Sequence, residues 1–303
     1  MAKSKVVNVA AVKKLSPFRY PGGKTWLVPY AKAWLASLPH KPTNFIEPFA
    51  GGGIISLTVG FDGLADRVTM IELDDDVASV WQTIFGANAK WLWRRIEEFE
   101  ISVENVKKEL ESRSTSIRQK AFQTILKNRT YHGGILAAGS GLIKSGEAGK
   151  GISSRWYANT LSKRIQGIYE LRSKFDFIQG DGISLLNSYA KEENIVAFID
   201  PPYTAGKNGK RAGKRLYNHN QLDHEALFDV ASKLKGDFLM TYDNDTEVRD
   251  LARKFGFVTD LIPMKNTHHA EMTELVIGRN LDWLSDMRKA KPVNQWLFDP
   301  NAD

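Results

Sequence analysis

Residues 195–203 read IVAFIDPPY, an apolar run that ends in Asp200, two prolines and Tyr203. Five consecutive apolar residues predict a strand that is buried on both faces, which is typical of a parallel sheet in an α/β fold. Such sheets place their active sites at the carboxyl ends of the strands. We therefore expect Asp200 to lie at the opening of an active site.

The four residues after this strand suit a site that holds a flat base by its exocyclic amine. The lone pair of such an amine is delocalised into the ring, so a catalyst gains by accepting hydrogen bonds from its N–H groups. Asp200 and the Pro201 carbonyl supply two acceptors, and Pro201 and Pro202 restrict the turn. Tyr203 can stack on the ring. These residues predict methyl transfer to an amino nitrogen; the alternative is a strand that ends in a proline turn with a packed tyrosine.

A glycine-rich turn lies between a second predicted strand and a helix. Residues 44–59 read NFIEPFAGGGIISLTV, and the glycines allow the backbone to approach a cofactor closely. Residues 68–71 predict the next strand, and Glu72 follows Gly51 by 21 residues, about where an acid binds ribose hydroxyls in nucleotide sites. Phe49 replaces the first glycine of a dinucleotide fingerprint, which favours S-adenosylmethionine as the cofactor.

A third segment, SPFRYPGGK at residues 16–24, precedes the first of these strands and opens a helix. The order of the three segments resembles that of the DNA adenine-N6 methyltransferases of the Dam type, over roughly residues 16–280. The resemblance implies an α/β fold with a seven-stranded Rossmann-like methyltransferase sheet and an inserted, mostly helical target-recognition domain. It assigns residues 1–82 and 171–303 to the catalytic domain and residues 83–170 to the recognition domain.

The resemblance also implies which residues bind S-adenosylmethionine. Lys24 is suited to the methionine carboxylate, and Glu72 corresponds to the ribose-binding acid, where relatives often have aspartate. Asp181 corresponds to the acid that pairs with the adenine of the cofactor, and a turn aspartate at the surface is the alternative. The implied cofactor contacts are Tyr20, Lys24, Phe49, Gly51, Gly53, Glu72, Asp181 and Asp200.

The strand pattern disappears between Gln82 and Leu171. Apolar residues at spacings of three and four over 96–110 and again over 117–126 predict two packed helices. Residues 127–157 combine glycine and serine with basic and aromatic side chains, which predicts a hairpin or loop with basic tips. After the tetrapeptide, the pattern predicts helices at 223–234 and 246–255 and strands at 238–242, 257–262 and 274–278.

Basic and polar residues in two segments are candidates for DNA contacts. The first group begins with an Asn-Arg pair that matches one in the resembled family. The second group lies among glycines at 205–215, and this composition suits a loop that becomes ordered when it binds phosphates. A loop that contacts only solvent is the alternative for both. The candidates are Asn128, Arg129, Lys144, Lys150 and Arg155 in the recognition domain, and Lys207, Lys210, Arg211, Lys214 and Arg215 after the tetrapeptide.

The composition agrees with a nucleic-acid partner. The 303 residues include 42 Lys and Arg against 35 Asp and Glu, and the net charge of +7 favours a polyanion. No cysteine is present, which excludes disulfides, zinc–thiolate sites and methylation through a cysteine adduct. The six histidines show no ligand spacing for a metal, and no run of 18 apolar residues or secretory signal is evident. We expect a cytoplasmic protein that uses no metal and contacts no membrane.

These predictions combine into a mechanism on double-stranded DNA. The target adenine leaves the stack, Asp200 and Pro201 hold N6, Tyr203 stacks on the base, and N6 attacks the sulfonium methyl group in line. Two alternatives stay open. One is adenine-N6 methylation of RNA or amine methylation of protein, and the other is a DNA-binding regulator that keeps the cofactor pocket without catalysis.

Overall fold

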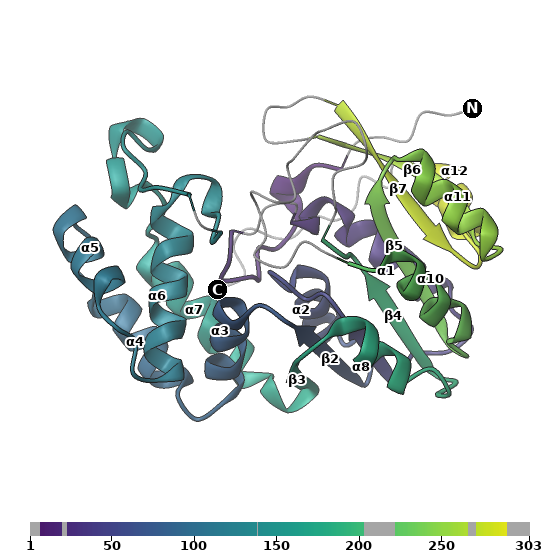
Figure 1. The fold of residues 1–303 in the computed structure, drawn as a ribbon, viewed down its shortest axis with the longest axis horizontal. Helices are drawn as coiled ribbons and strands as arrows, with labels where there is room; N and C mark the ends of the chain where they lie inside the picture. Colours follow the sequence, from purple (N-terminus) through teal and green to yellow (C-terminus); the bar gives the residue numbers. More distant parts are fainter. Residues whose placement is uncertain (1–6, 20–22, 138, 203–221, 266–270, 290–303) are drawn as a thin grey trace, which may run out of the picture.

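The computed structural model describes residues 7–19, 23–137, 139–202, 222–265 and 271–289. These residues form a seven-stranded sheet in the order β3-β2-β1-β4-β5-β7-β6 (Figure 1). Neighbouring strands from β3 through β5 pair in parallel, and β7 is antiparallel to β5 and β6. The predicted Rossmann-like sheet is confirmed. The strands are β1 (Asn44–Glu47), β2 (Arg67–Glu72), β3 (Phe175–Gln179), β4 (Ile195–Ile199), β5 (Asp237–Asp243), β6 (Val258–Lys265) and β7 (Glu271–Gly278).

The strand order has its switch point between β1 and β4. Chain order runs outward from β1 to β3 on one side and from β4 to β5 on the other, and sheets of this kind bind ligands at the carboxyl ends of the strands at the switch point. All five residues of β4 are buried, as the apolar run predicts. Asp200 follows β4 directly and therefore lies at this switch point.

Alternation along the central strands sends side chains into two apolar cores. Phe45 and Phe198 belong to one core, and Ile46, Ala197 and Ile199 belong to the other. This period of two is expected for strands that are covered on both faces. Helices of the first core include α1 (Val28–Ser37), α2 (Ile54–Asp62), α3 (Asp75–Phe85) and α12 (Asp282–Lys289), and those of the second are α8 (Gly182–Ser188), α10 (His224–Lys233) and α11 (Thr246–Lys254).

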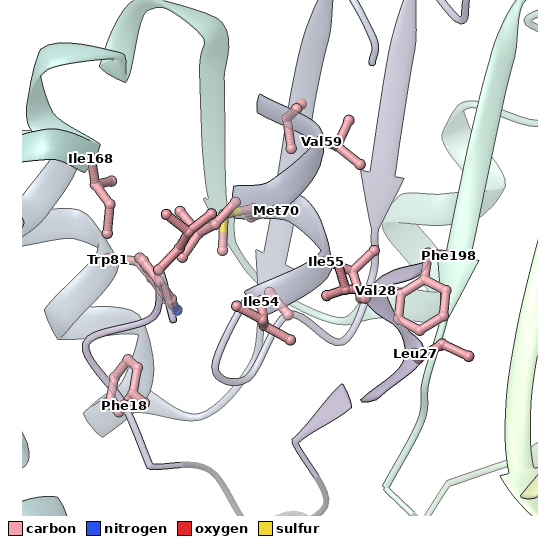
Figure 2. Packing of buried hydrophobic residues seen from close by; sticks show 14 of the residues in the cluster. Phe18, Leu27, Val28, Ile54, Ile55, Val59, Met70, Trp81, Ile168 and Phe198 are labelled. Carbon is pink, nitrogen blue, oxygen red and sulfur yellow. The ribbon is translucent and has the colours of Figure 1, made fainter. Parts of the chain in front are cut away.

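Trp81 of α3 connects the sheet to the chain that precedes the first helix. Its ring centroid lies 5.6 Å from that of Phe18, and Figure 2 shows the Trp81 ring between Phe18 and Met70 of β2. The indole N–H donates a hydrogen bond to the Gly51 carbonyl at 2.9 Å. A buried tryptophan therefore fixes the position of the glycine turn.

The inserted segment is helical, as predicted, and lies beside the sheet at the left of Figure 1. One helix is expected over residues 96–110, and this prediction is wrong. Helix α4 ends at Glu98, and α5 begins after Ser102, whose hydroxyl accepts a hydrogen bond from the Asn105 N–H at 3.0 Å. The apolar spacing continues across the break because both helices pack against α6. The inserted helices are α4 (Ala89–Glu98), α5 (Val103–Glu111), α6 (Ile117–Thr130) and α7 (Ala158–Glu170).

Turns rather than a regular hairpin follow α6. Within the described ranges the only strand-like contact there is a single antiparallel bridge between Tyr131 and Leu142. The rest consists of short 3-10 segments at His132–Gly134, Glu147–Gly149 and Gly151–Arg155. Most buried apolar residues of the insertion belong to the same continuous core as the first face of the sheet.

Candidate active site

Asp200 is held by groups from two other elements. Its Oδ1 accepts a hydrogen bond from the Thr241 hydroxyl at 2.8 Å and lies 2.9 Å from the Lys24 ammonium nitrogen. Thr241 is in place because β4 and β5 pair in parallel, with Ile199 opposite Met240, so that the residues which follow these two are neighbours. The orientation of the carboxylate is therefore fixed by the sheet.

Lys24 is buried between two carboxylates. Its side chain is 5% exposed, and its ammonium nitrogen lies 3.0 Å from Oε1 of Glu274 on β7 as well as close to Asp200. Burial alone lowers the pKa of Lys24, but the charges of Asp200 and Glu274 and their hydrogen bonds outweigh burial and raise that pKa. Lys24 is therefore charged at neutral pH and neutralises one of the two carboxylates.

Glu47, the last residue of β1, is a further buried acid. Its Oε2 accepts hydrogen bonds from the Ser56 hydroxyl and, at 3.0 Å, from the Ser56 N–H. Burial raises the pKa of Glu47 to about 8; the two bonds from Ser56 oppose this shift, and the charges of Asp200 and Glu72 add to it. The Glu47 carboxyl is therefore mostly protonated at neutral pH.

The glycine turn after β1 needs residues without a side chain. Gly51 and Gly53 have φ values of 45° and 62°, in the left-handed region that favours glycine. A Cβ atom on Gly53 would lie 2.5 Å from Cε of Met70. The turn is also tied to β2, because the Gly51 N–H donates a hydrogen bond to Oε2 of Glu72 at 2.8 Å.

Glu72, the last residue of β2, joins the glycine turn to the start of α3. Its Oε1 accepts a hydrogen bond from the Asp74 N–H at 2.8 Å. Burial raises the pKa of Glu72 to about 7, while the N–H groups of Asp74 and Gly51 lower it and the Asp74 charge raises it. Each carboxylate oxygen can accept a second hydrogen bond, so Glu72 is chemically able to bind ribose hydroxyls.

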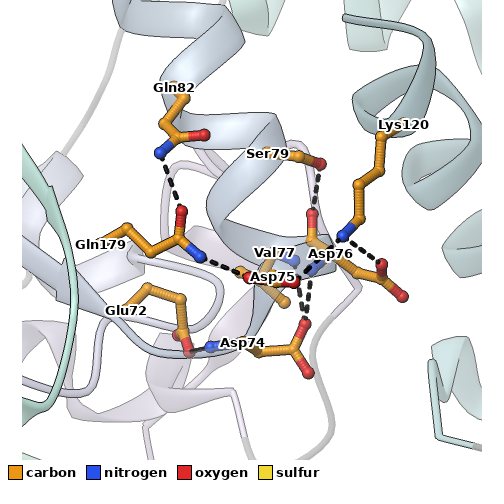
Figure 3. Close-up of polar contacts among 9 residues, drawn as sticks. All are labelled: Glu72, Asp74, Asp75, Asp76, Val77, Ser79, Gln82, Lys120 and Gln179. Atoms are coloured by element: carbon orange, nitrogen blue, oxygen red, sulfur yellow. Dashed lines mark hydrogen bonds and ion pairs between the residues drawn. The ribbon is translucent and has the colours of Figure 1, made fainter. Parts of the chain in front are cut away.

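An open cleft lies beside Glu72, at the carboxyl ends of β2 and β3. Figure 3 shows its polar network, in which Lys120 of α6 lies 3.5 Å from Asp75 and 3.4 Å from Asp76. Leu73 is 43% exposed and adds an apolar surface among these acids. Such a surface suits a flat heterocycle with an amine. The cleft is lined by Leu73, Asp74, Asp75, Asp76, Lys120, Gln179 and Gly180.

Asp181 is exposed next to this cleft, at the start of α8. Its Oδ1 accepts a hydrogen bond from the Ser184 N–H at 2.7 Å and caps the helix. The adjacent Gly182 packs so closely that a Cβ atom there would lie 2.2 Å from the Pro48 carbonyl oxygen and 3.0 Å from the Phe49 ring. This packing brings Asp181 close to the glycine turn, and its contact with the cofactor adenine stays a prediction.

Several predicted site residues lie outside the described part of the chain. Of the catalytic tetrapeptide, the structure describes Asp200, the buried Pro201 and the half-buried Pro202. The predicted residues outside the described ranges are Tyr20, Tyr203, Lys207, Lys210, Arg211, Lys214 and Arg215.

Asn128 and Arg129, two of the predicted DNA contacts, are buried and hold other parts of the protein. The Asn128 side chain accepts a hydrogen bond from the Arg19 N–H at 2.9 Å and donates to the Arg19 carbonyl at 3.0 Å. Arg129 donates to the Pro17 carbonyl. Both residues therefore position the segment that leads to Tyr20, and their contact with DNA stays a prediction.

The other predicted DNA contacts of the insertion lie closer to solvent. Lys144 and Lys150 are exposed in the turns that follow α6. Arg155 is half-buried and forms an ion pair with Glu147. Exposed cations on a turn are available for phosphates, as the prediction requires.

Comparison with known protein families identifies this arrangement. A family model for the D12 class of N6 adenine-specific DNA methyltransferases matches residues 20–263. The chain belongs to this family. The match includes Lys24, the glycine turn, the inserted helices and Asp200, and it confirms the resemblance to Dam-type enzymes. It indicates an adenine-N6 methyltransferase and implies S-adenosylmethionine as the methyl donor.

The solved structures to which the chain is similar are distant in sequence. A proposed RNA methyltransferase from Pyrococcus horikoshii has 12% identity and a TM-score of 0.39, with coverage of 89% of this chain and 92% of the other. The rRNA methyltransferase AviRa from Streptomyces viridochromogenes has 14% identity, a TM-score of 0.38 and coverage of 86% and 85%. These likenesses carry no information on the substrate of this chain. Comparison with curated proteins gave no significant match.

Four residues of the site are not singled out by the sequence analysis. Glu47 and Glu274 have a signal in the sequence, because each is an acid beside the apolar residues of a buried strand. Thr241 and Leu73 have none, since their importance depends on the register of β5 and on exposure beside the cleft.

In the described ranges, no helix has both the length and the apolar surface that crossing a membrane requires.

Proposed function

We propose that the protein is a site-specific DNA methyltransferase that transfers a methyl group from S-adenosylmethionine to N6 of a flipped-out adenine in duplex DNA. The observation that carries this proposal is the position of the Asp200 carboxylate. Thr241 and Lys24 hold it at the end of β4, and the neighbouring strand β1 leads into the glycine turn that Glu72 fixes. An acceptor for an amine and a turn for the cofactor therefore share one edge of the sheet, as direct transfer between two bound molecules requires.

The described residues fit the cofactor that the family implies. The glycine turn allows close approach, Glu72 has acceptor capacity for hydroxyl groups, and Leu73 gives an apolar surface beside acids. When bound, S-adenosylmethionine supplies an activated methyl group on a sulfonium. The residues proposed to hold it are Tyr20, Lys24, Phe49, Gly51, Gly53, Glu72, Asp181 and Asp200.

Asp200, Pro201, Pro202 and Tyr203 form the proposed catalytic set. The Asp200 carboxylate and the Pro201 carbonyl each accept one hydrogen bond from the adenine amine, which favours the tetrahedral nitrogen that forms during transfer. Pro202 restricts the turn and Tyr203 stacks on the base. Preorganised groups of this kind typically contribute about 10²–10³ each in rate.

We further propose that residues 83–170 recognise the target sequence. The exposed Lys144 and Lys150 place positive charge on the turns after α6, and Arg155 lies at the end of the same region. The basic residues of 205–215, which follow the tetrapeptide in sequence, are proposed to contact DNA phosphates. The remaining residues of the predicted interface, Asn128 and Arg129, support the segment before Tyr20.

One experiment tests the substrate directly. Purified protein is incubated with labelled S-adenosylmethionine and, separately, with DNA, RNA and protein. Label in DNA as N6-methyladenine, lost in Asp200→Ala and kept in Asp250→Ala, supports the proposal; Asp250 is an exposed acid of α11. Label only in RNA or protein would replace the proposed substrate. DNA binding without label in any acceptor would favour a DNA-binding regulator that does not catalyse methyl transfer.

A further inference from the structure

Four arginines converge where the chain before the first helix crosses the inserted helices. Two of them bind that chain directly: Arg129 at the end of α6 donates to the Pro17 carbonyl, and Arg164 of α7 donates to the Ser16 carbonyl at 3.0 Å. Arg19 belongs to the bound segment itself, and its backbone is held by α6. Arg155 ends the 3-10 segment Gly151–Arg155, which packs against α6.

These four positive charges have little acidic compensation. Within the described ranges, no carboxylate forms an ion pair with Arg19, Arg129 or Arg164, and the partner of Arg155 is the half-exposed Glu147. Burial, followed by the charges of Arg164, Arg19 and Arg155, lowers the pKa of Arg129 to about 9, which still leaves it charged at neutral pH. Like charges that are held together without counter-ions repel one another, so an anion bound among them is favoured.

One buried donor of this arginine cluster also lacks a partner. Arg129 is 3% exposed, and its Nε atom is buried with no hydrogen-bond partner in the described part of the chain. A buried donor without an acceptor costs about 1–3 kcal/mol, so such donors are expected to mark the site of an absent acceptor.

We propose that Arg19, Arg155 and Arg164, arranged around the buried Arg129, form a binding site for a backbone phosphate of the nucleic-acid substrate. The three outer guanidinium groups are partly exposed and present the planar donor pairs that match phosphate oxygens. This inference rests on the proposed function, because it takes the anion to be a nucleic-acid phosphate. Arg129 and Arg164 also hold the backbone of residues 16–17, a few residues before Lys24 in sequence. Phosphate binding at the arginines is therefore connected through this segment to Lys24, the ion-pair partner of Asp200.

The test uses the two arginines whose guanidinium groups do not hold the backbone of residues 16–17. Arg19→Gln with Arg155→Gln is compared with Lys235→Gln plus Arg253→Gln, which removes two exposed charges outside residues 83–170. Binding to a short DNA duplex is measured against salt concentration. The slope of log affinity on log salt should become shallower by about 0.9 for a lost phosphate contact in the first variant and stay unchanged in the control. Equal slopes in the wild type and the first variant would overturn the proposal.

Two further measurements keep the outcome unambiguous. The Arg19→Lys and Arg155→Lys double variant keeps both charges, so it should recover most of the slope, and failure to recover it would indicate a structural effect instead of a phosphate contact. Methyl transfer to DNA is measured on the same samples. Methylation of DNA by the wild type, together with an unchanged salt slope in the first variant, rejects the phosphate site alone. The expected change in slope without methylation by the wild type rejects the proposed function alone.

Discussion

Glu47→Gln is expected to change how the stability of the protein depends on pH. Burial raises the pKa of Glu47 to about 8 in the folded protein, whereas a glutamate in an unfolded chain titrates near 4.3. Between these values the folded state binds more protons than the unfolded state, so the free energy of unfolding of the wild type falls as pH rises. At about 1.4 kcal/mol for each pKa unit, the loss approaches roughly 4–5 kcal/mol near pH 8 and does not grow above it.

The variant should lack this loss. Glutamine keeps an acceptor for the Ser56 N–H and hydroxyl but carries no titratable proton. Other acids such as Glu72 titrate in both proteins, so their contributions largely cancel when the free energies of unfolding of the two proteins are subtracted. The free energy of unfolding of the variant should therefore rise relative to that of the wild type by several kcal/mol, on the order of the value above, between about pH 5 and about pH 8.

Urea unfolding followed by tryptophan fluorescence at a series of pH values measures this difference. Glu98→Gln, at an exposed position of α4, is the matched control and should follow the wild type at every pH. Parallel stability curves for Glu47→Gln and the wild type would refute the reasoning, because they would show that Glu47 releases its proton in the folded state without a penalty.

Four further outcomes are expected. Asp200→Ala should lower single-turnover methyl transfer by about 10²–10³ while DNA affinity changes by only a few-fold, and a rate above about a tenth of wild type would contradict its role. Glu72→Gln should weaken the binding of S-adenosylmethionine in calorimetry but leave DNA binding unchanged, because its carboxylate fixes the glycine turn. Neutralising the five basic residues of 205–215 should lower the salt slope by about 0.9 for each lost phosphate contact, and an unchanged slope would assign them to solvent. Replacing residues 144–150 by glycine should relax the choice of methylated sites on a long DNA while cofactor binding persists; an unchanged site list would place recognition elsewhere.

The strands and the glycine turn could be predicted because their signals are local. The run at 195–199 is buried on both faces, so it contains no polar residue, and the positive φ of Gly51 and Gly53 requires glycine in the sequence itself. The break between α4 and α5 could not be predicted in this way. Both helices pack against α6, so the apolar spacing continues across the capping Ser102.

The partners of the predicted site residues could not be read from sequence because the sheet brings them together. Lys24 meets Asp200 and Glu274 only when β4 and β7 flank β5, and Thr241 reaches Asp200 through the register of two parallel strands. Asn128 is a comparable case. Its amide looks available for DNA in the sequence, but the fold uses it to bind the backbone of Arg19.

The charges around Asp200 suit the chemistry that is proposed there. Lys24 neutralises one of its two carboxylate partners, and Glu47 keeps its proton near neutral pH, so the cluster retains about one negative charge. An ionised Glu47 would add a buried carboxylate without adding a cation, and burial opposes that state. A sulfonium cofactor brings one positive charge, which its demethylated product lacks. If S-adenosylmethionine binds at this site, the excess negative charge would favour the methyl donor over the product, and Asp200 would stabilise the positive charge that passes to the amine nitrogen.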